Sequence, residues 1–164
     1  ALAEMISARE REGHRLAGML TGHLVQLRAL AAQAMPLVPQ LVDQQRQRFL
    51  ARWQEAMGLA NPASGDLALP SDAAQDRAMT EATAFAIRID VAEELTRLSS
   101  HLDEIERLIA QGGEVGKRLD FLIQELHREA NTLGSKSAVI EMTRISVDMK
   151  VLIEQMREQV QNIE

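Results

Sequence analysis

The sequence predicts an all-α fold of long helical hairpins that pack as a coiled-coil-like bundle. Apolar residues recur at spacings of three and four over most of the 164 residues, which is the period of an amphipathic helix. Aromatic residues make up only 2% of the chain, whereas strands draw on aromatic and β-branched residues. No segment alternates apolar and polar residues long enough to predict a strand.

Composition also excludes several kinds of protein. The chain has no Cys, so neither a disulfide framework nor a thiolate metal site is expected. The scarcity of aromatic residues argues against a nucleic-acid-binding platform that stacks successive bases. No apolar run approaches the roughly 18 residues of a membrane span, and the charged start of the chain lacks a signal-peptide core. We therefore expect a cytoplasmic protein without a membrane partner.

The first predicted unit, residues 1–113, is a long helical hairpin with a loop at 58–72. Residues 1–57 have helical apolar spacing, interrupted by Pro36 and Pro39, where a kink or short break is expected because proline lacks an amide donor. The helix should end near Gly58, and Ser71 with Asp72 should cap the next one. Residues 73–111 then form a helix with a heptad stripe, made of Val91, Leu95, Leu98, Leu102, Ile105 and Ile109.

The second predicted unit, residues 114–164, is a C-terminal helical hairpin. Gly112 and Gly113 end the preceding helix. One helix is expected at 114–133, with its inward face at Leu119, Leu122, Ile123, Leu126 and Ala130. Gly134 should break the chain, and a last helix should span 137–163, with an inward face that includes Met142, Ile145, Met149, Leu152, Met156, Val160 and Ile163.

Charge is distributed unevenly along the chain. Lys and Arg total 18 against 24 Asp and Glu, which gives a net charge of −6. Residues 66–113 hold ten of the acidic groups and four of the basic ones. This is not the basic footprint of a nucleic-acid-binding protein.

Two helical stretches concentrate chemically capable side chains. In the first, Asp90, Glu94 and His101 share one side of a helix with Arg97 and could supply oxygen and imidazole ligands to Mn²⁺ or Mg²⁺. The alternative is a solvated face with Glu–Arg pairs.

In the second stretch, one stripe holds Asp120, Gln124, His127 and Asn131. Glu125 and Glu129 lie one turn apart on a neighbouring stripe. This density of acid, imidazole and amide groups suits metal binding or acid–base work, and equally suits a polar network that fixes helix register.

Four segments resemble the bacterial YicC/YloC family. They are GKRLDFLIQELHREANTLGSKS (116–137), VLIEQMREQVQNIE (151–164), RIDVAEELTRLSSHL (88–102) and ISAREREG (6–13). The resemblance implies a divalent-metal-dependent endoribonuclease of the bacterial cytoplasm that takes part in RNA turnover. It also implies a ring-like homo-oligomer, with a hexameric ring as one form, and a strand-rich N-terminal domain ahead of this chain. His127 stands where the family usually has Asn.

The family signature and the chemistry of its residues give one predicted site. Residues expected to act in catalysis are Glu125, Glu129, His101, Arg128 and Lys136. Of these, Arg128 and Lys136 are expected to hold phosphate oxygens. Residues expected to bind Mn²⁺ or Mg²⁺ are Asp90, Glu94, Asp120, Glu125 and Glu129. The alternatives are a non-catalytic oligomerisation module, whose active surface lies elsewhere, and an adaptor that recruits another nuclease.

Overall fold

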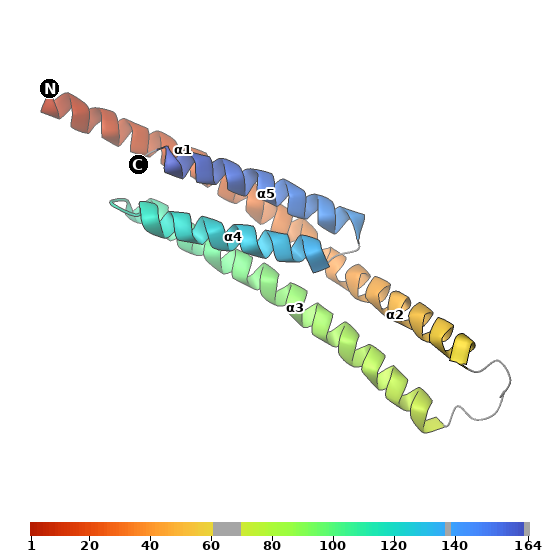
Figure 1. The fold of residues 1–164 in the computed structure, drawn as a ribbon. Coiled ribbons are helices and arrows are strands. Elements are labelled where there is room, and N and C mark those ends of the chain that lie inside the picture. The colour runs from red at the N-terminus through yellow and green to blue at the C-terminus, as the bar shows by residue number, and fades with distance from the viewer. Residues whose placement is uncertain (61–69, 137–138, 163–164) are drawn as a thin grey trace.

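The computed structural model confirms the all-α prediction. It describes residues 1–60, 70–136 and 139–162, and gives side-chain surroundings for all of these except positions 45, 53, 54, 56–60, 70–75, 81, 84, 85, 87–89 and 136. The described residues contain no strand. The elements are α1 (Leu2–Ala34), the short 3₁₀ helix η1 (Met35–Leu37), α2 (Val38–Ala60), α3 (Pro70–Gln111), α4 (Gly116–Lys136) and α5 (Ile140–Gln161) (Figure 1).

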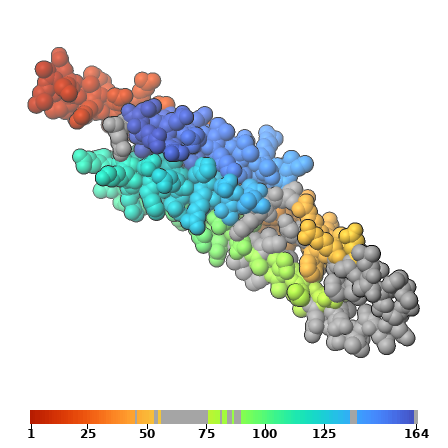
Figure 2. Space-filling model, viewed as in Figure 1, coloured from red at the N-terminus to blue at the C-terminus, as the bar shows by residue number. Residues whose placement is uncertain are grey.

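Helices α1, α3, α4 and α5 form an antiparallel bundle, and a two-helix arm extends beyond it. In the bundle α1 packs on α3, α3 on α4, α4 on α5, and α5 back on α1. Beyond it, α2 and the first part of α3 run side by side as a two-helix arm (Figure 1). The space-filling view shows α4 and α5 lying along one face, with the start of α1 beyond the end of α5 (Figure 2). The heptad spacing of α3 explains this lengthwise packing.

The proline pair produces the predicted interruption between α1 and α2. Pro36 lies within η1, and Pro39 is the second residue of α2. The tighter 3₁₀ turn accommodates a residue that cannot donate the usual helical hydrogen bond. Leu37, Val38 and Leu41 remain buried through this region. The apolar face therefore continues from α1 into α2 across the interruption.

The core contains the residues that the helical spacing predicts. Five residues of the heptad stripe are 0–2% exposed, and Ile109 packs against the core from its edge. The predicted inward faces of α4 and α5 are also buried, with Leu152 at the edge and Ile163 outside the described residues. At the start of α1, by contrast, the apolar residues Leu2, Met5 and Ile6 are 73%, 62% and 52% exposed. Their spacing is helical, but they lie where α1 extends past the bundle (Figure 1).

Two local predictions were wrong. Gly134 does not break the chain, since α4 continues through it to Lys136. A Cβ atom at Gly134 would lie 2.5 Å from Ser146 Oγ, so this glycine permits close approach of α4 and α5. Helix α3 begins at Pro70, which places Ser71 and Asp72 inside its first turn and not at its cap. Proline is favoured at that first helical position because its missing N–H would have no helical partner there.

The turn between α3 and α4 sets how these two helices face each other. Gly112 and Gly113 have φ of 69° and 85°, the left-handed conformation that glycine adopts without strain. Only four residues separate the two helices, so the chain reverses sharply. The C-terminal half of α3 therefore lies antiparallel against α4 (Figure 1).

Candidate active site

A polar cavity of about 510 Å³ lies between α3 and α4. Helix α3 contributes Glu94, Arg97 and His101, whose spacing of three and four places them along one helix face. Helix α4 contributes Glu125, Arg128, Glu129 and Thr132, which also share one helix face because they are three or four residues apart. We call these seven residues the α3–α4 cavity. The sharp turn at Gly112 and Gly113 brings the two faces together although they are far apart in sequence.

The centre of the α3–α4 cavity is a pair formed by His101 and Glu129. His101 Nδ1 lies 2.9 Å from Glu129 Oε1 and 3.0 Å from Oε2. The Glu129 side chain is 4% exposed and that of His101 is 25% exposed. Glu129 lies between the buried residues Leu126 and Leu133 on the core side of α4, which explains its burial. With Nδ1–H donating to the carboxylate, His101 Nε2 is left for a proton or a metal ion.

The surroundings of Glu129 oppose its negative charge. Burial is the main cause that raises the pKa of this carboxyl above its usual value, because a charged group loses its hydration there. The hydrogen bond and charge of His101 act in the opposite direction, and the nearby negative charges of Glu94 and Glu125 raise the pKa further. A buried acid beside a histidine in a cavity is typical of a functional site.

Two arginines lie at the same cavity as this acid cluster. Arg97 lies 3.6 Å from Glu94 and 3.5 Å from Glu93, both loose pairs, and the Arg97 side chain is itself exposed. Arg128 is exposed and has no ion-pair partner in the described part of the chain. Its guanidinium is thus available to an anionic ligand, for which its planar donors are well suited.

The donor set of the cavity fits a divalent cation. His101, Glu125 and Glu129 each offer one ligand atom, and these atoms all lie within 4.8 Å of one another. Two carboxylates suit Mn²⁺ or Mg²⁺, and the imidazole favours the transition metal Mn²⁺ over Mg²⁺. A cation there would also offset the mutual repulsion of Glu94, Glu125 and Glu129.

The structure brings together only some of the predicted site residues. Glu94, His101, Glu125, Arg128 and Glu129 line the cavity, and the backbone of Lys136 is in α4 while its side chain is outside the described residues.

The remaining predicted ligands, Asp90 and Asp120, are not among the lining residues. Asp90 is exposed and precedes His101 on α3 by about 16 Å of helix. Asp120 Oδ2 accepts a hydrogen bond from Gln124 Nε2 at 3.1 Å, and its buried Oδ1 finds no partner among the described residues.

Two cavity residues were absent from the predicted site. Arg97 lies between Glu94 and His101 on α3, and its spacing placed it on their side of the helix, but no role was predicted for it. Thr132 lies one turn after Arg128, and its hydroxyl donates to the Arg128 carbonyl oxygen at 2.9 Å. His127, which replaces the usual Asn of the family signature, is exposed and does not line the cavity.

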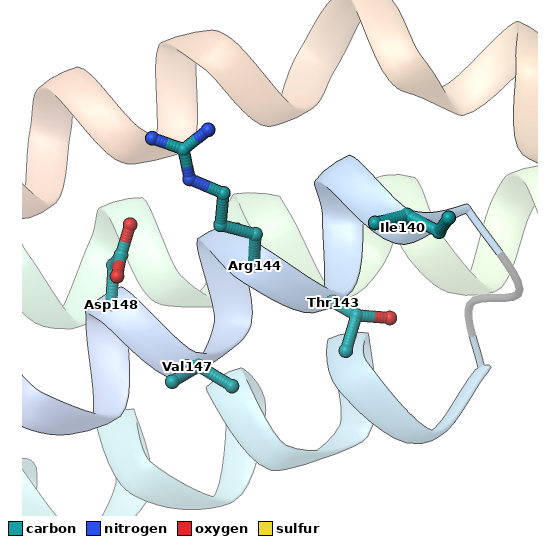
Figure 3. Close-up of a pocket in the computed structure, with 5 residues that line it drawn as sticks. All are labelled: Ile140, Thr143, Arg144, Val147 and Asp148. Atoms are coloured by element: carbon teal, nitrogen blue, oxygen red, sulfur yellow. The ribbon is translucent and has the colours of Figure 1, made fainter.

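Two other hollows have less suitable chemistry. One, of about 560 Å³, lies by the α3–α4 turn and is lined mainly by apolar side chains, with Glu10 and His14 as its titratable groups. The other, of about 370 Å³, lies on α5, where Arg144 and Asp148 project to one side and Thr143 and Val147 to the other (Figure 3). Neither hollow brings several acids together with a histidine. The α3–α4 cavity is therefore the better candidate site, although the apolar hollow is slightly larger.

The fold and this cavity define an all-α protein with a carboxylate–imidazole centre between two helices. The model of the family described as "Endoribonuclease YicC-like, C-terminal" matches residues 34–164, which include the whole cavity. The chain belongs to this family, as the resemblance predicted.

Two curated relatives agree with this assignment. The "Probable endoribonuclease YicC" of Haemophilus influenzae is 39% identical over 163 residues, which are 99% of this chain and 52% of that protein. The protein of the same name from Clostridioides difficile is 40% identical over 95 residues, which are 58% of this chain and 32% of that protein. The chain thus spans about half the length of the Haemophilus relative.

No described helix has both the length and the hydropathy that a membrane crossing requires.

Proposed function

We propose that this chain forms the catalytic part of a divalent-metal-dependent endoribonuclease that cleaves RNA phosphodiester bonds in the bacterial cytoplasm. The observation that supports this most is the cavity itself, in which buried Glu129 pairs with half-buried His101 beside Glu125 and exposed Arg128. The names of the relatives point to the same reaction. RNA is the proposed substrate, and surfaces outside this chain would contribute to its binding.

The proposed ligands of the cation, Mn²⁺ or Mg²⁺, are His101, Glu125 and Glu129, whose ligand atoms lie close together. A bound divalent cation would lower the pKa of a coordinated water and neutralise charge on the scissile phosphate. Glu94, at the α3 side of the cavity, would add to the negative potential that attracts the cation.

The other groups would hold RNA and move protons. Arg128, which is exposed and without an ion pair among the described residues, would contact a phosphate oxygen. Arg97 is loosely paired and could exchange its carboxylate partners for phosphate. His101, fixed by Glu129, would hold or pass a proton when it is not bound to metal. Lys136 remains a proposed phosphate contact from the family signature.

The exposed apolar residues support a second proposed role in self-association. Leu2, Met5 and Ile6 have most of their surface exposed at the start of α1. We propose that the protein is a homo-oligomer, with a hexameric ring as the form to test. If the chain served only as an oligomerisation module, its polar cavity would hold α3 and α4 in register and would not be needed for cleavage.

The experiment is RNA cleavage by the intact protein with Mn²⁺ or Mg²⁺, compared with EDTA. We expect cleavage to require the metal and to fall strongly in His101→Ala, Glu125→Ala and Glu129→Ala. Circular dichroism would verify that each variant is folded, and sedimentation would report assembly. Unchanged cleavage in these variants would exclude the site, and intact assembly without any metal-dependent cleavage would favour the oligomerisation role.

A further inference from the structure

An exposed phenylalanine lies on α4 beside the cavity. Phe121 is 54% exposed, whereas the other large apolar residues of α4 are at most 4% exposed. The chain has only three Phe and one Trp, so aromatic side chains are scarce in this molecule. Packing of the core does not account for its position, because the adjacent Leu122 already fills the inward side.

Helix geometry places Phe121 on the same lengthwise strip as the cavity. Phe121 precedes Glu125 by one turn, about 6 Å along the axis. At about 100° per residue, Phe121, Glu125, Arg128 and Thr132 all fall within an arc of roughly 60°. The last three of these residues line the cavity. The ring therefore lies on the exposed side of α4, one turn before the cavity residue Glu125, and not on the side of α4 that faces α5.

Arginines lie on both sides of this ring along α4. Arg118 is one turn before Phe121, and its side chain is 62% exposed with a loose 3.7 Å contact to Glu104. Arg128 lies two turns after Phe121 and belongs to the cavity. Proteins that bind single-stranded nucleic acids combine cations that contact the backbone with aromatic rings on which bases stack. Arg118, Phe121 and Arg128 present this combination in a single row.

We propose that Phe121 stacks on a base of single-stranded RNA, next to the nucleotide whose phosphate enters the α3–α4 cavity. This inference rests on the proposed function and adds to it that the substrate is unpaired at this position. A base within a duplex would have its faces covered by its neighbours. Because every base has an aromatic face, the contact selects single-stranded RNA without selecting its sequence.

The test is binding of a fluorescent single-stranded RNA of about twelve nucleotides to the intact protein in EDTA, which separates binding from metal-dependent cleavage. We expect Phe121→Ala to weaken binding by about 5- to 150-fold in Kd, the size of one base-stacking contact. Phe121→Trp should retain the affinity, and Phe121→Leu should not. Val147→Ala removes a similarly exposed apolar side chain from α5, 51% exposed, and should have little effect.

Oligonucleotides with one abasic nucleotide locate the contact. An abasic nucleotide at the stacking position should weaken binding to the unmodified protein and have no further effect in Phe121→Ala. Normal affinity in Phe121→Ala, or full affinity in Phe121→Leu, would overturn the proposal. A change in sedimentation of Phe121→Ala would place the ring in a protein interface and also overturn it.

Cleavage kinetics distinguish failure of this inference from failure of the proposed function. If both hold, Phe121→Ala should raise KM with little change in kcat. Cleavage with an unchanged KM would reject the stacking contact and leave the proposed function intact. Weaker RNA binding in Phe121→Ala, without metal-dependent cleavage by any form of the protein, would reject the proposed function and support the contact.

Discussion

Helix α3 takes part in two charged clusters, one with α4 and one with α1. Comparing them shows what distinguishes a candidate site from a structural contact. In the α3–α4 cavity, His101 meets Glu129 at 2.9 Å. In the second cluster, which we call the α1–α3 cluster, Arg28 of α1 meets Asp103 and Glu106 of α3 at 2.7 Å each. The distances are similar, but the Glu129 side chain is 4% exposed, whereas those of Asp103 and Glu106 are 68% and 63% exposed. Short ion-pair distances therefore do not identify a site, while burial separates the two clusters.

The pKa is raised in both clusters, but the shift favours the charged form of Arg28 and disfavours the charged form of Glu129. In the α1–α3 cluster, the hydrogen bond from Arg28 to Asp103 is the main cause that raises the pKa of the guanidinium, so folding favours its charged form. In the α3–α4 cavity, burial is the main cause that raises the pKa of Glu129, so folding disfavours its charged form. Both clusters have one carboxylate more than they have arginines, but in the first the carboxylates are exposed to water. In the second, a buried carboxylate lies near two others, and a cation could offset their repulsion.

The largest expected difference between the clusters is in catalysis. Glu129→Gln preserves the size of a cavity side chain and removes its charge, and we expect RNA cleavage to fall by about 10²- to 10⁴-fold. Glu106→Gln makes the same change in the α1–α3 cluster and should alter the rate less than about twofold. Single-turnover cleavage with saturating metal measures both. Equal losses in the two variants would contradict the assignment of catalysis to the cavity.

The second difference is in stability. Replacing a buried polar pair by apolar residues of similar size is often neutral or stabilising by about 1–4 kcal/mol. We expect His101→Leu combined with Glu129→Leu to raise the free energy of unfolding within this range while abolishing cleavage. Urea denaturation followed by circular dichroism measures the change. A clear loss of stability would instead mean that the pair serves the fold, as the polar-network alternative requires.

The third difference is in the pH dependence of stability. Because the folded-state pKa of Glu129 is raised above its usual value of 4.5, its contribution to the free energy of unfolding is fully present below pH 4.5. This contribution is lost as pH rises through the folded-state pKa. The free energy of unfolding of the unmodified chain minus that of Glu129→Gln should therefore fall as pH rises. Urea denaturation at a series of pH values would show it.

Glu104 supplies the matched control for this pH series. The hydrogen bond from Arg107 is the main cause that lowers the pKa of this carboxyl. Its contribution to stability is present above its usual value of 4.5 and is lost as pH falls through the folded-state pKa. The same subtraction made with Glu104→Gln should therefore rise with pH. Parallel slopes for the two variants would show that burial does not govern Glu129.

The sequence predicted the helices and their inward faces better than it predicted contacts between helices. Leu95, Leu98 and Leu102 were predicted to be buried because periodicity along one helix depends only on local spacing. Gly134 was misinterpreted because its role depends on Ser146, which lies on another helix. Within a single helix, glycine most often predicts an end.

The same limit explains the site. Glu94 and His101 were predicted to share a face of α3, and Glu125 with Glu129 a face of α4. The meeting of His101 with Glu129 depends on the register of α3 against α4, which the turn at Gly112 and Gly113 and the packing of both cores determine. Asp90 fits the spacing of the same α3 face but lies too far along the helix to reach that register. Spacing identifies a face, whereas packing selects the residues on it that meet.

The smallest expected effect belongs to the α1–α3 cluster. Arg28→Met keeps an unbranched apolar stem and removes both ion pairs, each of which should contribute about 0.2–1 kcal/mol because their groups are exposed. The loss of unfolding free energy should shrink at 1 M salt, where the screening length falls to about 3 Å. Asp103→Asn, which removes one of the two carboxylate charges, should lose less than Arg28→Met. A loss in Arg28→Met that salt does not change would contradict an electrostatic origin of this contribution.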